Sequence, residues 1–324
     1  MTGTAPLGRD GRDTDGPGGD GRRDTDGRNT DGRGGGWRGG DYTAAGDAWA
    51  HAADDVAALA LGLLGRRPGA AAPLVLDVGT GSGPAARAAA RAGAHAVGLD
   101  REAALLRVAA ARARDAGLTG AGARGGAGAA ARRPYGTARF VVGDALALPF
   151  PARSFDAVLS TFGVMFAPDP PRTAAELARV CRPGGLVAVA SWTPDGVMGR
   201  IAPTVTRHLD RRPVGPPPTR WGEPDRVHAW FAPLPVTVRT HVAHVRVAYP
   251  SVAHAVRVFE NKPGPLRAHR AALEAAGRWG AAREDLAALF AAHGRSGDGR
   301  LVMDAPYLVT LARADVCGGV RRGS

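Results

Sequence analysis

The sequence predicts an open, Rossmann-like α/β sheet that is mostly parallel, with helices on both faces and an antiparallel last strand. Three observations predict it. Short apolar runs alternate with longer runs of helical periodicity, which is typical of parallel strands joined by right-handed crossovers. The first apolar run enters a loop with glycine at every second position, Gly79, Gly81 and Gly83. The second run ends at Asp100, where a ligand of a parallel sheet would bind.

The elements follow from apolar runs and their periods, in chain order. A helix is predicted over Tyr42–Leu64, because large apolar residues recur there at steps of three or four. Next come the alternating elements, with strands at 74–78, 95–99, 138–142, 155–160 and 185–191 and helices at 84–92, 101–116 and 172–181. After Trp192 prolines become frequent, and the later pattern predicts a strand at 236–249, a helical stretch at 266–292 and a last strand at 301–313.

These elements divide the chain into four parts. Residues 1–41 are rich in Gly, Asp and Arg and have few apolar side chains, so we expect a disordered tail. Residues 42–193 form the ligand-binding core, interrupted by a Gly-, Ala- and Arg-rich insert at 117–136 that we expect to be flexible. Residues 194–314 are expected to complete the sheet and to cover the cleft as a lid, and 315–324 form a second disordered tail.

Composition limits the classes of function. The formal net charge is +12, which invites a nucleic-acid partner. However, the arginines are scattered and no aromatic residues alternate with them, as binding of single strands would require, so a nucleic-acid partner is not favoured. Two cysteines exclude a disulfide framework or a zinc cluster, and no apolar run approaches the roughly 20 residues that span a bilayer. We expect a soluble, cytoplasmic protein without a metal site.

Four motifs, taken together and in order, resemble those of the class I S-adenosylmethionine-dependent methyltransferases. Within that class the chain is most similar to the group of ubiquinone and menaquinone C-methyltransferases (methyltransferase type 11). The resemblance covers about residues 41–313, apart from the insert, and it rests on Val75–Gly83, Val97–Asp100, Val142–Ser160 and Arg179–Val187. It implies S-adenosylmethionine as the cofactor and a methyl acceptor that the sequence does not identify. The oligomeric state of the protein also stays open.

The resemblance also implies which residues contact the cofactor. Asp77 suits a ligand that carries positive charge, and Asp100 is placed to accept hydrogen bonds from the ribose hydroxyls. Asp144 is placed beside the adenine amino group. Each acid also has a structural interpretation, Asp77 as a loop cap and Asp144 as a helix N-cap. The predicted cofactor-binding residues are Asp77, Gly79, Thr80, Gly81, Gly83, Asp100, Arg101, Asp144, Ala145 and Ser160.

The sequence signals for the methyl acceptor are less specific than those for the cofactor. The exit of the fourth strand lacks the Asn/Asp-Pro-Pro-Tyr signature of amino-group methylation on nucleobases or glutamine amides, which favours a small-molecule acceptor. Phe162, Met165 and Phe166 form either an apolar floor for that acceptor or ordinary core. A general base is needed only for a weak nucleophile, and the candidates for it are Tyr42, His51 and His208.

Two alternatives stay open at this point. A non-catalytic regulatory module could bind S-adenosylmethionine through the same motifs, because methyl transfer to a good nucleophile needs positioning more than acid–base residues. An NAD(P)-dependent oxidoreductase would share the fold type, but its fingerprint requires a third glycine after two intervening residues. Pro84 occupies that position, which disfavours the oxidoreductase.

Overall fold

The computed structural model describes residues 49–65, 71–120, 135–211, 215–261, 264–297 and 299–316. The predicted N-terminal tail, Tyr42, residues 121–134 of the predicted insert and residues 317–324 lie outside the described residues. A helix covers most of the first predicted helical segment, from Ala50 to Leu63.

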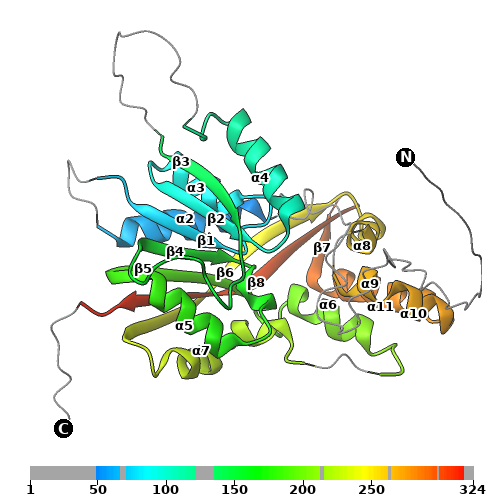
Figure 1. Cartoon of the computed structure of the whole chain (residues 1–324). Helices are drawn as coiled ribbons and strands as arrows, with labels where there is room; N and C mark the ends of the chain where they lie inside the picture. The colour runs from blue at the N-terminus through cyan, green and yellow to red at the C-terminus, as the bar shows by residue number, and fades with distance from the viewer. Residues whose placement is uncertain are drawn as a thin grey trace, which may run out of the picture. The chain divides into compact units, whose positions relative to one another are not determined.

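One mixed sheet organises the fold, with strand order β3-β2-β1-β4-β5-β8-β6 (Figure 1). The strands from β3 to β5 are parallel, whereas β8 is antiparallel to both β5 and β6. The predicted fold class, including the antiparallel last strand, is therefore confirmed. The strand bounds are β1 Leu74–Val78, β2 His95–Asp100, β3 Thr137–Val142, β4 Phe155–Thr161, β5 Cys181–Trp192, β6 Val236–Tyr249, β7 Gly294–Gly297 and β8 Arg300–Ala314.

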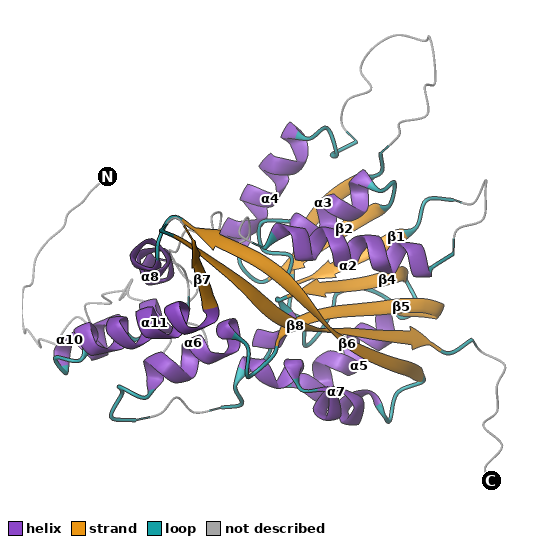
Figure 2. Ribbon diagram, turned by 180° about the vertical axis from the view of Figure 1, so that it is seen from behind, coloured by secondary structure: helices purple, strands orange, loops and turns teal. Residues whose placement is uncertain are grey.

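Helices cover both faces of this sheet. Figure 1 shows α5 and α7 in front of the strands, and Figure 2 shows α2 and α3 on the opposite face. The faces that α2 and α3 bury consist largely of alanine, and such small side chains let the two helices approach the sheet and each other closely. The bounds are α2 Ala50–Leu63, α3 Pro84–Arg91, α4 Ala103–Asp115, α5 Pro170–Val180 and α7 Pro224–Phe231.

The C-terminal part extends past the carboxyl end of the parallel strands. The last residue of β5, Trp192, pairs with Tyr307 of β8, and β8 continues from there to Arg300 while paired with β6. Further helices gather around this extension, beyond the edge at which β1 to β5 end (Figure 1). They are α6 Val197–Thr206, α8 Val252–Asn261, α9 Pro265–Ala268, α10 Arg270–Ala275 and α11 Trp279–His293.

The prediction of one helical stretch at 266–292 is wrong in detail. The region is divided into α9, α10 and α11, and α8 precedes them in a segment for which no helix was predicted. Gly277 explains one division, because it adopts a left-handed conformation (φ +67°) directly after α10, as a glycine at a helix C-terminus commonly does. Within the described residues, none of the helices combines the length and apolarity needed to cross a bilayer.

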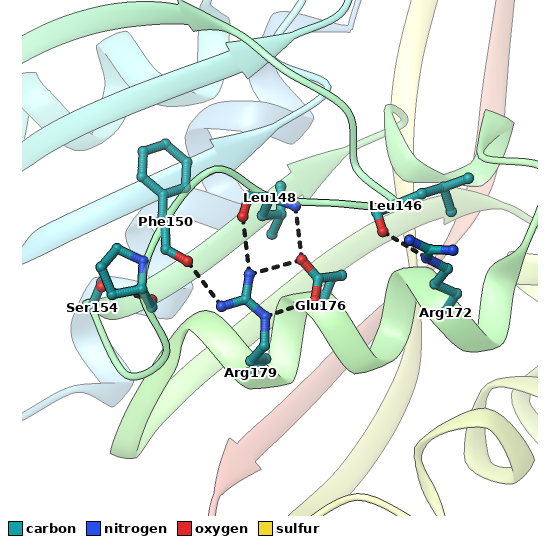
Figure 3. A network of polar contacts seen from close by, with 8 residues as sticks. Leu146, Leu148, Phe150, Ser154, Arg172, Glu176 and Arg179 are labelled. Atoms are coloured by element: carbon teal, nitrogen blue, oxygen red, sulfur yellow. Dashed lines mark hydrogen bonds and ion pairs between the residues drawn. The ribbon is translucent and has the colours of Figure 1, made fainter.

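A half-buried ion pair holds the loop that follows β3. Arg179 donates to Glu176 (Nε to Oε1, 2.6 Å) and to the carbonyl oxygens of Phe150 and Leu148, at 2.8 and 3.0 Å. Glu176 in turn accepts from the amide of Leu148 at 2.7 Å. Figure 3 shows both side chains on α5, directed at this loop. The pair therefore fixes the path of the chain just after Asp144.

We predict that Arg179→Met lowers the free energy of unfolding by about 1–3 kcal/mol, because two loop carbonyls lose their donor. Arg226→Met, which removes an exposed pair with Glu223, should change it by about 0.5 kcal/mol or less. Urea unfolding measures both. Equal losses in the two variants would show that the network does not hold the loop.

The same pair predicts a pH dependence. Arg179 holds the pKa of Glu176 below its ordinary value of 4.5. A lowered pKa in the folded state stabilises the protein above pH 4.5, and this contribution is lost as the pH falls through the lowered value. Acidification below pH 4.5 should therefore narrow the stability difference between wild type and Arg179→Met, as urea unfolding at several pH values would show.

Candidate active site

The loop after β1 lies against two neighbouring strand ends. The amides of Gly79 and Thr80 donate to the carbonyl of Leu99 in β2, at 2.8 and 2.9 Å. Gly79 has a φ of +69°, and a Cβ there would lie 2.8 Å from the Cα of Gly163, in the loop after β4. Glycine is thus required at position 79 both for its conformation and for backbone contact.

Gly81 differs from its two neighbours in the motif. Its φ is +55°, yet a Cβ at this position would meet no protein atom within 4 Å. The loop therefore presents open space at Gly81. By contrast, a Cβ on Gly83 would lie 3.0 Å from the Ala109 Cβ, and Gly83 directly precedes α3, whose first residue is Pro84. Gly79 and Gly83 serve close packing, and Gly81 faces a space that a ligand can fill.

Asp100 closes one side of that space from the end of β2. Its Oδ2 accepts from the amide of Gly81 and its Oδ1 from the amide of Glu102, both at 2.9 Å. Burial raises the pKa of Asp100, against the opposing effect of these two hydrogen bonds. The amide of Gly143, after β3, donates to the carbonyl of Asp100 at 3.0 Å. The ends of β1, β2 and β3 therefore meet at Asp100, the first through its carboxylate and the third through its backbone carbonyl.

Asp77 is buried more deeply, with 1% of its surface exposed. Its Oδ2 accepts from the Thr80 hydroxyl at 2.6 Å and from the amide of Ala86 at 3.1 Å. Burial raises the pKa of Asp77 to about 6, although both hydrogen bonds act in the opposite direction. The carboxylate caps the loop and the start of α3, and its charge is also held in a place that strongly favours a positive partner.

The remaining predicted cofactor residues stand nearer the surface. Asp144 is exposed, and its Oδ1 accepts from the amide of Leu146 at 2.9 Å. This contact closes a turn that ends at Ala147, and no helix begins there, so the interpretation of Asp144 as a helix N-cap is wrong. The carboxylate lies at the surface, just beyond the end of β3. Arg101 is exposed and Ala145 half-buried. Both lie directly after acids of the motif.

Of three other predicted residues, two have hydrogen-bond partners within the protein and one is exposed on a helix. The hydroxyl of Ser160 is fully buried, donates to the carbonyl of Val78 at 2.7 Å and accepts from the amide of Val164 at 3.0 Å, so it joins β4 to β1. His208 Nε2 lies 2.5 Å from Oδ2 of Asp285 in α11. His51 is exposed on α2. Among the described residues there is no group of three metal-ligating side chains.

An aromatic quartet, which we define as Trp49, Phe162, Trp192 and Tyr307, lies at the ends of β4 and β5. Phe162 stacks on Trp192 with ring centroids 3.7 Å apart and planes 8° from parallel. Trp49 and Tyr307 meet Trp192 edge-on, at 5.5 and 6.3 Å. Phe162 also has a φ of +58°, a strained conformation for a bulky residue, which is common at functional sites.

Sequence analysis missed three members of this quartet, because they come from distant segments. It placed only Phe162 near the methyl donor, with Met165 and Phe166. Met165 is buried and Phe166 is 44% exposed, so the predicted floor is divided between core and surface. The sequence could have placed Trp192 at the site, because it is the last residue of the β5 apolar run. Residues at the carboxyl ends of parallel strands face the ligand crevice.

Residues 76–189 match a family model described as a methyltransferase domain. An uncharacterized protein from Mycobacterium tuberculosis is 42% identical over 173 residues, which are 53% of this chain and 54% of that protein. The chain thus spans about half the length of the curated relatives that it matches first. A demethylmenaquinone methyltransferase from Renibacterium salmoninarum is 37% identical over 119 residues, 37% of this chain and 41% of that protein.

Among solved structures, a SAM-dependent methyltransferase from Methanosarcina mazei aligns over 76% of this chain and 93% of its own, with 16% identity and a TM-score of 0.44. The sequence match coincides with the segment that holds the glycine loop and the acids after β1, β2 and β3. The match to a methyltransferase domain over residues 76–189 agrees with the resemblance predicted from the motifs.

Proposed function

We propose that this protein transfers the methyl group of S-adenosylmethionine to a small-molecule acceptor. One observation carries the proposal: the loop after β1 leaves open space at Gly81, whose amide donates to the buried carboxylate of Asp100, and the buried Asp77 lies at the start of the same loop. A cationic ligand fits this arrangement because two buried negative charges favour it. A pyrophosphate would be repelled by the same charges, so a dinucleotide is a poor fit.

Each part of the site has a role under this proposal. Asp77 attracts the positively charged methionine end, and the backbone at Gly81 allows the ligand to lie against the loop. Asp100 accepts from the ribose hydroxyls, and Asp144 lies beside the adenine. When bound, S-adenosylmethionine supplies a methyl group on a sulfonium, whose C–S bond breaks as the bond to the acceptor forms. The chain needs chiefly to align the acceptor and exclude water.

The acceptor would enter at the aromatic quartet. The quartet lies at the ends of β4 and β5, next to the loop that Gly79 contacts through Gly163. Its rings are largely buried, which provides the water-poor surroundings that the reaction favours. The named relative acts, by its name, on demethylmenaquinone, and this supports a small organic acceptor here. The C-terminal helices stand beyond the same strand ends, which supports a covering role for residues 194–314.

Label transfer tests the proposed activity. The protein is incubated with methyl-labelled S-adenosylmethionine and a cell extract of the organism that encodes it. We expect label in the low-molecular-weight fraction. Label in nucleic acid or protein would contradict the small-molecule acceptor. Binding of the donor without any transfer would contradict the enzyme and favour the regulatory module.

We predict that Gly81→Val lowers the affinity for S-adenosylmethionine at least about 100-fold, because its side chain fills the open space beside the loop. Gly277→Val is the matched control, since Gly277 also has a positive φ and open surroundings but lies between α10 and α11. Both variants should lose similar stability through strain, as thermal unfolding would show. Calorimetry measures the affinity, and equal affinities in the two variants would place the ligand elsewhere.

Asp100→Ala gives an independent check of the same site. It removes the carboxylate that we assign to the ribose hydroxyls, so affinity for S-adenosylmethionine should fall at least about tenfold. Circular dichroism should show that the variant remains folded. Unchanged affinity by calorimetry would contradict the assignment of Asp100.

A further prediction concerns Asp77. Because its pKa is raised to about 6, the folded protein binds a proton more tightly than the unfolded chain, and stability falls as the pH rises from about 4 to 6. Asp77→Asn should therefore raise the free energy of unfolding at pH 7.5 by about 1–3 kcal/mol. It should also weaken S-adenosylmethionine binding at least about tenfold.

Urea unfolding and calorimetry measure the two effects. Asp169→Asn, in the exposed N-cap of α5, is the matched control and should change neither. In wild type, the affinity should increase as the pH rises from 5 to 7, because a neutral Asp77 no longer attracts the ligand. If Asp77→Asn bound S-adenosylmethionine with wild-type affinity, the assignment of Asp77 to the binding site would be contradicted.

A further inference from the structure

Two consecutive residues of the 3-10 helix η3 (Pro218–Gly222) carry buried donors that lack partners. The Nε atom of Arg220 and the Nε1 atom of Trp221 are both inaccessible to solvent and make no hydrogen bond. No carboxylate of the described residues forms an ion pair with Arg220. Buried donors are nearly always paired in folded proteins, and a charged one is especially costly to leave unpaired. These two donors therefore indicate a missing acceptor.

The position of η3 relates these donors to the proposed reaction. Gly222 lies against the end of β5, where a Cβ on it would be 2.1 Å from the carbonyl oxygen of Trp192. The same helix contacts η2 (Val164–Phe166), which follows β4. The donors thus belong to the rim formed by the carboxyl ends of β4 and β5. Trp192, a member of the aromatic quartet, ends the strand on which η3 rests.

Packing fixes the Trp221 side chain, and a backbone hydrogen bond fixes the adjoining turn at Arg220. The amide of Arg220 donates to the carbonyl of Pro217 at 3.1 Å. The Trp221 ring packs against Trp230 and Phe231 of α7, with centroids 5.0 and 6.4 Å away, and it is 1% exposed. Arg220 is half-exposed, but its Nε atom is enclosed. The Trp221 indole is therefore pre-organised, and the outer part of the guanidinium remains open to a ligand.

We propose that Arg220, assisted by the Trp221 indole, binds a carboxylate of the methyl acceptor. This inference rests on the proposed function. A guanidinium and an indole N–H together offer one positive charge and several planar donors, which match a singly charged carboxylate. The adjacent quartet contacts the apolar part of the same molecule. The substrate class is therefore a small carboxylic acid with an apolar body.

The bound carboxylate positions the acceptor, and it is not the group that receives the methyl group. A guanidinium that pairs with a carboxylate withdraws its lone pairs and makes it a poor nucleophile. Another atom of the acceptor forms the bond to the methyl carbon as the C–S bond breaks, and any proton on that atom leaves to solvent. The product therefore keeps its negative charge.

The test compares Arg220→Gln, Arg220→Lys and wild type in the label-transfer assay, with extract diluted until transfer is proportional to it. Labelled small molecules are passed over an anion exchanger at pH 7. We expect the wild-type product to be retained. Arg220→Gln should transfer label at least about tenfold more slowly, and Arg220→Lys should recover part of the rate because it restores the charge without the planar donors. Arg239→Gln, at an exposed position of β6, should behave as wild type.

Trp221→Phe provides a second variant that keeps an aromatic ring but removes the N–H together with part of the indole, and it should slow transfer severalfold while thermal unfolding reports the lost packing. Calorimetry with S-adenosylhomocysteine should give wild-type affinity for all variants. A labelled product in the flow-through, or wild-type rates for both Arg220→Gln and Trp221→Phe, would overturn the inference while leaving the methyltransferase proposal intact. Failure of wild type to bind S-adenosylhomocysteine would instead overturn the proposed function and this inference with it.

Discussion

Close approach between backbones at the glycine loop is the constraint on which the rest of the site depends. At Gly79 the loop lies against Gly163 after β4, and at Gly81 its amide reaches Asp100 at the end of β2. A larger residue at position 79 would push these strand ends apart. The alanine-rich faces of α2 and α3 serve the same purpose, because they let the helices sit close behind the loop without disturbing it.

Two acids of the molecule, Glu176 and Asp77, contrast in how they affect folding. Glu176 has Arg179 beside it, its pKa is lowered, and the pair strengthens the fold. Asp77 has no cationic partner among the described side chains, and burial raises its pKa. Ionised Asp77 therefore opposes folding. A chain that retains such a charge at the start of its ligand loop gives up stability for a position that a cation can occupy.

The sequence predicted most of the parallel sheet, because strand and loop signals there are local. The glycine motif, Asp77 and Asp100 lie within one βαβ unit, and their meeting follows from parallel pairing alone. Contacts between distant segments were not predictable in this way. Trp49 and Tyr307 are far apart in sequence, and so are Leu148 and the Glu176 side chain that accepts from its amide. One division of the 266–292 stretch, between α10 and α11, followed from Gly277, a helix-ending glycine that the apolar periodicity did not reveal.

This contrast also explains why the donor half of the site is recognisable and the acceptor half is not. The donor half is built from residues that one motif brings together, whereas the acceptor half joins α2, β4, β5, β8 and η3. Two local features indicate the chemistry of the proposed acceptor half. They are the strained backbone at Phe162 and the unpaired donors of Arg220 and Trp221. Folding alone does not favour any of these features. All three residues lie near the carboxyl ends of β4 and β5, where the proposed acceptor would bind.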